Sequence, residues 1–220
     1  MNYSIIYSII GLFISLIVLH IIMQLWFMTG NKGKLLEAKH AFSPFGFNVE
    51  QFLIDGKVPE IIEPQCDTLD EVADSKLSQG IKLLKKIGRE NDALLVEDSG
   101  LFIDSLGGFP GVYSAYVLDK IGCEGILKIM GKNIRKASFQ ASARFWDGQK
   151  VHKGSGICPG TIVDSIRGNF GFGYDPIFVP SDYLGFSTEG LTFGEVEISI
   201  KEKFSHRKKA LDGILLSFKN

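Results

Sequence analysis

The segment of residues 24–41 is the feature that most limits how this chain can fold. It opens with the apolar run QLWFM, which predicts a short buried strand, and passes directly into the glycine-flanked turn TGNKGK. Residues 33–41 then have helical character. A strand that turns tightly into a helix is typical of open α/β sheets, whose ligands usually bind at the carboxyl ends of the strands. We therefore expect an α/β fold with this turn at a ligand-binding edge.

A second helix is predicted shortly afterwards. Thr68 and Glu71 have the spacing of a capping box, and an apolar stripe with a helical period runs from Leu69 to Leu84. Gly88 follows and is expected to end the helix. Residues 207–218 carry the last helical stripe of the chain.

Strands are predicted in the middle of the chain. Residues 93–97 form an apolar run that is expected to end at the acidic pair Glu97 and Asp98. Residues 138–146 alternate apolar and polar side chains, which indicates a half-buried strand. The dipeptide at residues 147–148 is Asp-Gly, which predicts a hairpin turn into a further strand at 149–158.

Composition excludes several classes of protein. Lys and Arg number 24 against 25 Asp and Glu, so the chain lacks the basic surplus of a protein that follows a nucleic acid. The three cysteines show no C-x-x-C spacing, which argues against a disulfide framework and against a zinc site. A polymeric partner is therefore not suggested.

The turn at residues 29–34 has the chemistry of a phosphate site. It combines short polar side chains, glycines that let backbone N–H groups face an anion, and two lysines near a helix N-terminus: Thr29, Gly30, Asn31, Lys32, Gly33 and Lys34. It is not a Walker A loop, because Leu35 stands where a magnesium-binding Ser or Thr would be. Taken alone, the turn also fits an ordinary glycine turn before a helix.

Three further motifs add acidic, aromatic and cationic groups. VEDSGL at residues 96–101 places adjacent carboxylates on a strand, where they point to opposite faces, so that only one faces a site. FGYD at residues 172–175 can offer an aromatic face to a base. SHR at residues 205–207 supplies hydrogen-bond donors, which suit the 6-keto oxygen of a purine. Such donors cannot pair with the 6-amino group of adenine, and a buried unpaired group costs about 1–3 kcal/mol.

With these motifs and the longer run LLVEDSGLFIDSLGGFPGVYSA, the chain resembles the inosine triphosphate pyrophosphatase family from about residue 24 to about residue 218. Members hydrolyse non-standard purine nucleoside triphosphates (ITP, dITP, XTP) to the monophosphate and pyrophosphate, and so remove them from the nucleotide pool. The resemblance implies an elongated mixed twisted sheet flanked by helices, with two lobes and the active cleft between them. It also implies Mg²⁺ as the cofactor and a homodimer.

The resemblance further implies roles for single residues. Asp98 and Lys34 would be catalytic, with Asp98 as a magnesium ligand or as the base that positions water. Glu63, in the E-x-Q of IIEPQCDTLDEVA, would be the second metal ligand. Glu60 is the alternative, because it follows Pro59 in a Pro-Glu pair that the family also shows. The implied substrate contacts are the six turn residues and Ser99, Phe172, Gly173, Tyr174, Asp175, Lys201, His206 and Arg207.

The apolar N-terminus permits two interpretations. Residues 3–22 form a nearly continuous apolar run of about 20 residues, roughly 30 Å as a helix, which is enough to span a bilayer. A span there would leave only about two residues as a tether to the first strand. Met23 stands one residue before that strand, where members of the family typically begin. We therefore expect residues 1–22 not to belong to the working protein, and residues 23–220 to form a cytoplasmic enzyme; a single-pass membrane anchor through residues 3–22 is the alternative.

Two functions from other classes stay open. A non-catalytic purine nucleotide sensor would keep the phosphate turn and the donors of residues 205–207, but it would not need both Glu63 and Asp98. A membrane-anchored phosphohydrolase would explain residues 3–22, but it would not need a base-binding motif.

Overall fold

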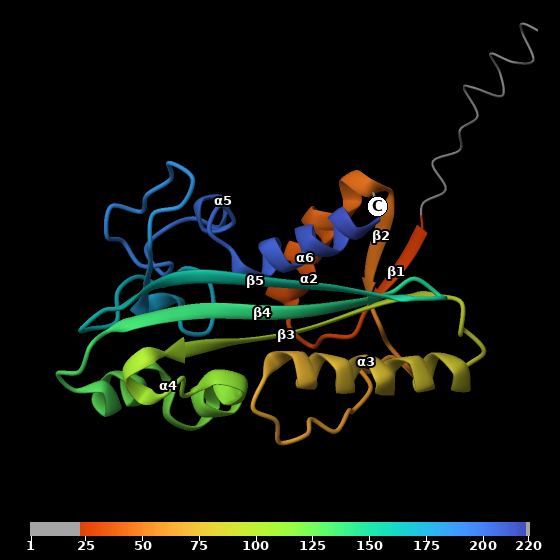
Figure 1. Cartoon of the computed structure of the whole chain (residues 1–220), viewed down its shortest axis with the longest axis horizontal. Coiled ribbons are helices and arrows are strands. Elements are labelled where there is room, and N and C mark those ends of the chain that lie inside the picture. The colour runs from red at the N-terminus through yellow and green to blue at the C-terminus, as the bar shows by residue number, and fades with distance from the viewer. Residues whose placement is uncertain (1–22, 219–220) are drawn as a thin grey trace, which may run out of the picture.

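One mixed sheet of six strands forms the centre of the computed structural model, which describes residues 23–218 (Figure 1). The strand order is β2-β1-β3-β4-β5-β6, parallel from β2 to β3 and antiparallel from β3 to β6. The strands are β1 (Met23–Phe27), β2 (Phe47–Gln51), β3 (Ala93–Ile103), β4 (Lys136–Trp146), β5 (Val151–Ile162) and β6 (Phe178–Pro180). The expected α/β class and mixed sheet are confirmed.

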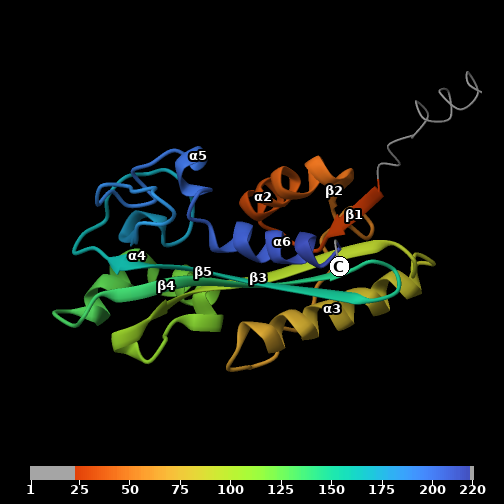
Figure 2. The ribbon, with the colours of Figure 1, turned by 45° about the horizontal axis from the view of Figure 1, so that its top comes forward.

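Helices cover both faces of this sheet. In Figures 1 and 2, α2 and α6 lie over one face, whereas α3 and α4 lie over the other. The helices are α2 (Lys32–Phe42), α3 (Leu69–Lys86), α4 (Ser114–Met130), α5 (Ile198–Lys201) and α6 (His206–Ser217). Short 3-10 helices are η1 (Ser43–Phe45), η2 (Asp104–Leu106), η3 (Gly111–Tyr113) and η4 (Asp175–Ile177).

Two apolar clusters lie at opposite ends of the long strands and define two lobes. One cluster packs α2 and α6 against the sheet and includes Phe42 and Phe145. The other packs α4 and the chain around β6 against the far end and includes Phe139 and Phe178. A third cluster lies beneath α3. The two-lobed sheet expected from the family resemblance is therefore present.

Strand β3 is longer than the sequence predicted. The expected end at the acidic pair is wrong, because β4 pairs with β3 as far as Ile103, opposite Ala137. β1 pairs with β3 only as far as Leu95. Beyond that residue, no strand within residues 23–218 pairs with the other edge of β3, which has only an isolated bridge from Phe102 to Pro110. Glu97 and Asp98 therefore lie in the middle of β3, beside a stretch of edge that no described strand covers.

Local signals in the sequence account for both long helices of the first half. Asn31 caps α2, since its side chain accepts a hydrogen bond from the Lys34 N–H at 3.1 Å. The predicted capping box of Thr68 and Glu71 is present at the start of α3. Gly88 follows α3 with φ of 71°, the left-handed conformation that favours glycine at a helix end.

Helix α6 approaches β5 closely at two glycines of the strand. A Cβ atom at Gly154 would overlap the carbonyl oxygen of Ala210, and one at Gly156 would overlap that of His206. Both positions therefore need glycine so that the backbones can approach. This approach fixes the start of α6, and with it His206 and Arg207, above the centre of the sheet.

The described part of the chain contains no helix that is long and apolar enough to cross a membrane. Residues 1–22 lie outside the described residues. The membrane anchor and the start of the working protein consequently stay predictions.

Candidate active site

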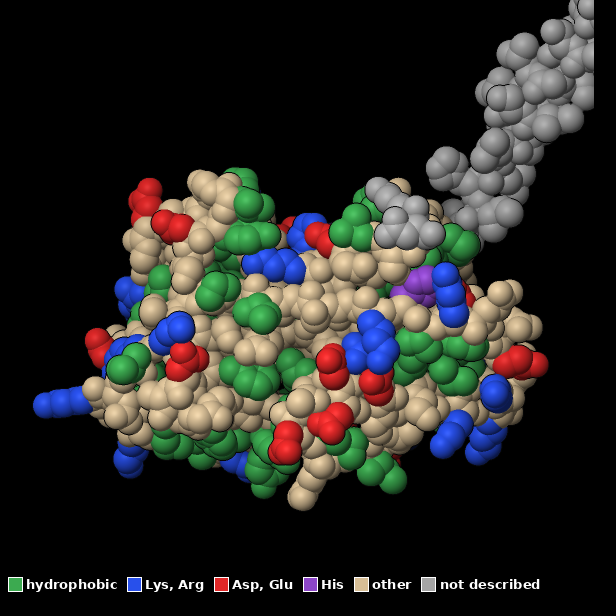
Figure 3. All heavy atoms as spheres, in the orientation of Figure 1, with side chains coloured by type: hydrophobic (Ala, Val, Ile, Leu, Met, Phe, Trp, Pro, Cys, Tyr) green, Lys and Arg blue, Asp and Glu red, His purple; other side chains and the backbone are tan. Residues whose placement is uncertain are grey.

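A pocket of about 130 Å³ lies between the two lobes. Figure 3 shows the surface notched between the side that holds α5 and the side that holds α2, with basic and acidic side chains in the notch. Most of the predicted substrate contacts line this pocket: Asn31, Lys34, Ser99, Phe172, Gly173, Tyr174, Asp175, Lys201, His206 and Arg207. Residues from four separate parts of the chain are thus brought together.

The rest of the phosphate turn lies outside the pocket wall. Lys32 and Gly30 are exposed. Thr29 is buried, and its hydroxyl accepts a hydrogen bond from the Asn31 N–H at 3.1 Å, which shapes the turn. Gly33 lies beneath the ring of Phe172, which a Cβ atom would strike.

Two carboxylates and two cationic side chains form a buried network that connects the turn to α6. Lys34 Nζ lies 2.6 Å from Glu97 Oε2, and Arg207 Nε donates to Glu97 Oε1 at 3.1 Å. Arg207 also donates through Nη1 to Glu37 Oε1 at 2.8 Å and through Nη2 to Ser99 Oγ at 3.1 Å. Burial alone would raise the pKa of Glu97, but Arg207 and Lys34 outweigh it and hold this pKa at about 2. Glu97 is therefore a buried anion, not a solvated strand end.

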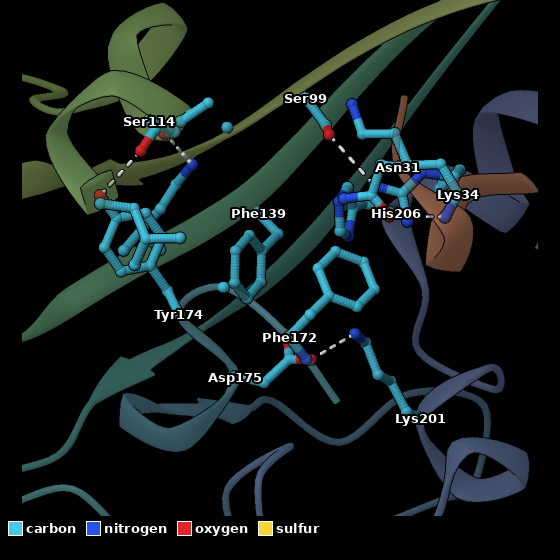
Figure 4. Close-up of a pocket in the computed structure, with 16 residues that line it drawn as sticks. Asn31, Lys34, Ser99, Ser114, Phe139, Phe172, Tyr174, Asp175, Lys201 and His206 are labelled. Carbon is cyan, nitrogen blue, oxygen red and sulfur yellow. Dashed lines mark hydrogen bonds and ion pairs between the residues drawn. The ribbon is translucent and has the colours of Figure 1, made fainter. Parts of the chain in front are cut away.

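The loop that precedes β6 holds an aromatic ring at the pocket. Asp175 anchors this loop, because it accepts from the Phe172 N–H at 2.8 Å and pairs with Lys201 Nζ at 2.6 Å. The Lys201 ammonium in turn lies 4.3 Å from the centre of the Phe172 ring. Figure 4 shows Phe172 between Lys201 and the group of Asn31, Lys34 and His206. The Phe172 ring offers an aromatic surface at the pocket on which a planar base can stack.

His206 is held neutral at the start of α6. Its ring stacks on Phe139 with the centroids 5.0 Å apart and 12° between the planes. Burial, with the neighbouring charge of Arg207, lowers its pKa well below the usual range. Nδ1 is buried and has no hydrogen-bond partner within residues 23–218. A neutral imidazole here can offer one ring nitrogen to a polar group of a ligand.

Asp98 lies on the opposite face of β3 from Glu97, as two neighbouring strand residues must. Its Oδ1 accepts from Lys76 Nζ at 2.5 Å, and the same ammonium lies 2.7 Å from Glu63 Oε1. Burial raises the pKa of Asp98 in spite of Lys76 and Lys34, which both lower it. Glu60 is exposed and has no ion pair with any described residue. The structure therefore brings Glu63, and not Glu60, to Asp98.

The sequence analysis missed Lys76. This residue is 8% exposed and lies on the buried side of α3, together with Ala73, Leu77 and Gly80. A lysine on an apolar helix stripe is seldom buried without a partner. That position in the stripe was the signal that could have found it.

The pair of Glu63 and Asp98 fits a magnesium ion. Both carboxylates pair with one cationic group, the Lys76 ammonium, so both lie within reach of a single cation. Among residues 23–218 no group of three or more His, Cys, Asp or Glu side chains could hold a metal. Magnesium does not need one, since it usually takes one or two carboxylates and completes its shell with phosphate oxygens and water.

The free edge of β3 connects the two faces. Lys34 stands at this edge, since it pairs with Glu97 on one face and also lowers the pKa of Asp98 on the other. A ligand with its base in the pocket can therefore extend phosphates past Lys34 to Asp98 and Glu63. This geometry suits a ligand that joins a planar ring to a chain of phosphates.

Comparisons with known proteins point in one direction. The model of the Ham1 family matches residues 25–216. The chain is 44% identical over 190 residues to a dITP/XTP pyrophosphatase of Thermococcus kodakarensis, covering 86% of this chain and 94% of that one. It is 43% identical to a dITP/XTP pyrophosphatase of Pyrococcus horikoshii, covering 86% and 93%.

Solved structures show the same fold. The Staphylococcus aureus Ham1 protein superposes with a TM-score of 0.70 at 25% identity, covering 90% of this chain and all of that one. A HAM1 protein from Coxiella burnetii superposes with a TM-score of 0.71 at 25% identity, covering 89% and 99%. The similarity thus extends over the sheet and both lobes.

Proposed function

Because this chain belongs to the Ham1 family, we propose that it is a dITP/XTP pyrophosphatase, which hydrolyses these nucleotides and ITP to the monophosphate and pyrophosphate. The family resemblance seen in the motifs is confirmed. The observation that carries the proposal is the path from the pocket, past Lys34, to Asp98 and Glu63. It joins a base site, a phosphate site and a pair of acids in one line.

The described residues can perform this hydrolysis. Asp98 would hold a water molecule and accept its proton as the water oxygen attacks the α-phosphorus. The bond from the α-phosphorus to the bridging oxygen then breaks, and its electron pair leaves with pyrophosphate. Lys34 and the N–H groups of the turn would stabilise the charge on the departing group. A non-catalytic sensor would not need Asp98, Lys76 and Glu63 to be assembled.

Magnesium is the cofactor that we propose for this reaction. Glu63 and Asp98 would hold it beside the phosphates. When bound, it would neutralise phosphate charge and polarise the phosphoryl oxygens. The homodimer and the cytoplasmic location expected from the family stay predictions.

Product analysis tests the proposal. We expect purified protein with magnesium to release pyrophosphate from ITP and XTP much faster than from ATP, by about 10²-fold or more in kcat/KM, because a site built for a 6-keto group leaves donors unpaired against adenine. Orthophosphate as the first product, or equal rates on ATP, would refute it.

The choice of metal ligand has its own test. Glu63→Gln should lower kcat by about 10–100-fold, the loss typical of a disturbed metal site, because the change keeps the shape but removes a ligand charge. Glu60→Gln is the matched control and should stay close to wild type, since Glu60 is exposed and is not among the ion-pair partners of Lys76, which are Glu63 and Asp98. Steady-state kinetics across a magnesium titration measure both. A crippled Glu60→Gln beside a normal Glu63→Gln would reverse the assignment.

A further inference from the structure

The buried side chain of Arg144 donates hydrogen bonds to the first two turns of helix α3. Arg144, on β4, is 2% exposed, and its Nε donates to Asp74 Oδ1 at 2.6 Å. Its Nη2 donates to Asp70 Oδ1 at 2.9 Å, and its Nη1 donates to Ser142 Oγ at 2.7 Å. Ser142 in turn donates to Asp70 Oδ1. The guanidinium thus holds two carboxylates one helical turn apart, in the fork geometry that arginine suits best.

This contact is not needed to neutralise the acids. The side chains of Asp70 and Asp74 are 68% and 48% exposed, so water solvates both. The buried partner is Arg144, and placing its charge beneath a helix costs free energy unless the geometry is good. A role in placing the helix accounts for that cost better than a role in charge balance.

The hydrogen bonds from Arg144 to Asp70 and Asp74 lie on one flank of α3, and Lys76 lies on the other. At 3.6 residues per turn, position 76 is about 120° around the helix axis from position 70 and about 160° from position 74. The apolar stripe between them packs on the sheet. Figures 1 and 2 show α3 lying along the sheet beneath its strands. A rolling motion of α3 about its axis would therefore move Lys76 towards or away from β3.

These hydrogen bonds are also next to the reacting groups. Ser142 stands directly opposite Asp98 in the β3-β4 pair, where Cβ atoms are about 4.5–5.5 Å apart. Arg144 is two residues further along the same face of β4. Asp70 and Asp74 are thus held one strand away from the carboxylate that Lys76 must reach.

We propose that Arg144 is a positioning residue, which fixes the roll of α3 on the sheet and so keeps the Lys76 ammonium in contact with Asp98 and Glu63, the two carboxylates proposed to hold the metal. It touches neither the pocket nor the substrate path. As a statement about catalysis, this inference rests on the proposed pyrophosphatase activity. As a statement about where Lys76 lies, it does not.

Kinetics of Arg144→Met and Arg144→Lys test the proposal, with Leu84→Val as the matched control. Leu84 is fully buried near the other end of α3 and contacts neither Arg144 nor the pocket. For Arg144→Met we expect kcat on ITP to fall by about 10–100-fold, with KM changed by less than about twofold, because the chemical step and not the pocket is disturbed. Arg144→Lys should recover part of kcat, since it keeps a charge beneath Asp70 and Asp74. Leu84→Val should lower the melting temperature but leave kcat within about twofold.

A normal kcat in Arg144→Met, or a loss of kcat in Leu84→Val that follows its melting temperature, would overturn the proposal. If Arg144→Met does not fold, the double variant Asp70→Asn, Asp74→Asn weakens the same hydrogen bonds from the exposed side. It should also lower kcat, and a normal kcat in this double variant would refute the proposal. A crystal structure of a folded variant gives a readout that is independent of activity. Lys76 still in contact with both carboxylates would refute the inference, whereas a wild-type protein inactive on ITP and XTP would refute only the proposed function.

Discussion

Asp98→Asn should lower kcat on ITP by about 10²–10⁴-fold, the range expected when a positioned proton acceptor is lost. Asparagine keeps the shape of the side chain but can neither accept the proton of the attacking water nor lend a negative charge to a metal. Folding should survive the change, because the buried Lys76 ammonium keeps Glu63 as a partner. Burial raises the pKa of Asp98, so its ionised form costs stability at neutral pH, and a neutral side chain of the same shape removes that cost.

Pyrophosphate release, with the melting temperature measured beside it, checks this expectation. Asp104→Asn is the matched control, because the same exchange is made at an exposed carboxylate just beyond the end of β3. Its kcat should equal that of wild type. An Asp98→Asn protein that keeps more than about a tenth of the wild-type kcat would show that another group takes the proton.

Arg207→Ala should lower the free energy of unfolding by about 3–5 kcal/mol, the usual consequence of removing one partner of a buried ion pair. Glu37 and Glu97 both lose their shared guanidinium, and the hydrogen bond that Glu37 keeps in the described part of the chain is the one from the Ser205 hydroxyl. Urea denaturation at neutral pH measures the effect. Adding Glu37→Gln to the Arg207→Ala protein should restore part of the stability, since one uncompensated charge is then absent.

Lys208→Ala is the control for this experiment. Lys208 is the next residue of α6, but it is half exposed, and its one ion pair within residues 23–218 is with the exposed Asp212, so its loss should stay within about 0.5 kcal/mol. If the two variants were equally stable, the buried cluster would not hold the fold together. We also expect the folded Arg207→Ala protein to lose more activity on ITP than on an adenine nucleotide. The N–H groups of Arg207 that are not bonded within the protein would donate to the 6-keto oxygen of a base, and adenine has no such oxygen.

Elements set by neighbours in the chain could be predicted from the sequence. The strand and turn before α2, the capping box of α3 and the hairpin turn after β4 each depend on a few adjacent residues. The length of β3 could not be predicted in this way. Its second half is a strand because β4, more than thirty residues later, pairs with it, and no pattern within residues 98–103 carries that information.

In the candidate site, too, the features set by adjacent residues could be predicted, whereas those set by distant residues could not. The structure brings residues of all four motifs to one cavity, among them Asn31, Lys34, Phe172 and Arg207, and their contacts with substrate stay predictions. The motifs did not show how Arg207 is held, because Glu37 belongs to no motif and meets it only through the packing of α2 on α6. Lys76 was missed for a related reason: its partners, Glu63 and Asp98, come from a loop and a strand that the helix pattern does not reveal.

If His206 and Arg207 bind the base as proposed, the close approach of α6 to β5 makes the choice of substrate depend on two glycines outside the pocket wall. His206 and Arg207 reach the pocket only because Gly154 and Gly156 let the helix backbone rest on the strand. One added methyl group at either glycine would lift the helix and carry both side chains with it. Relatives of this protein could thus drift in which purines they accept through the spacing between two backbones, while every residue of the pocket stays the same.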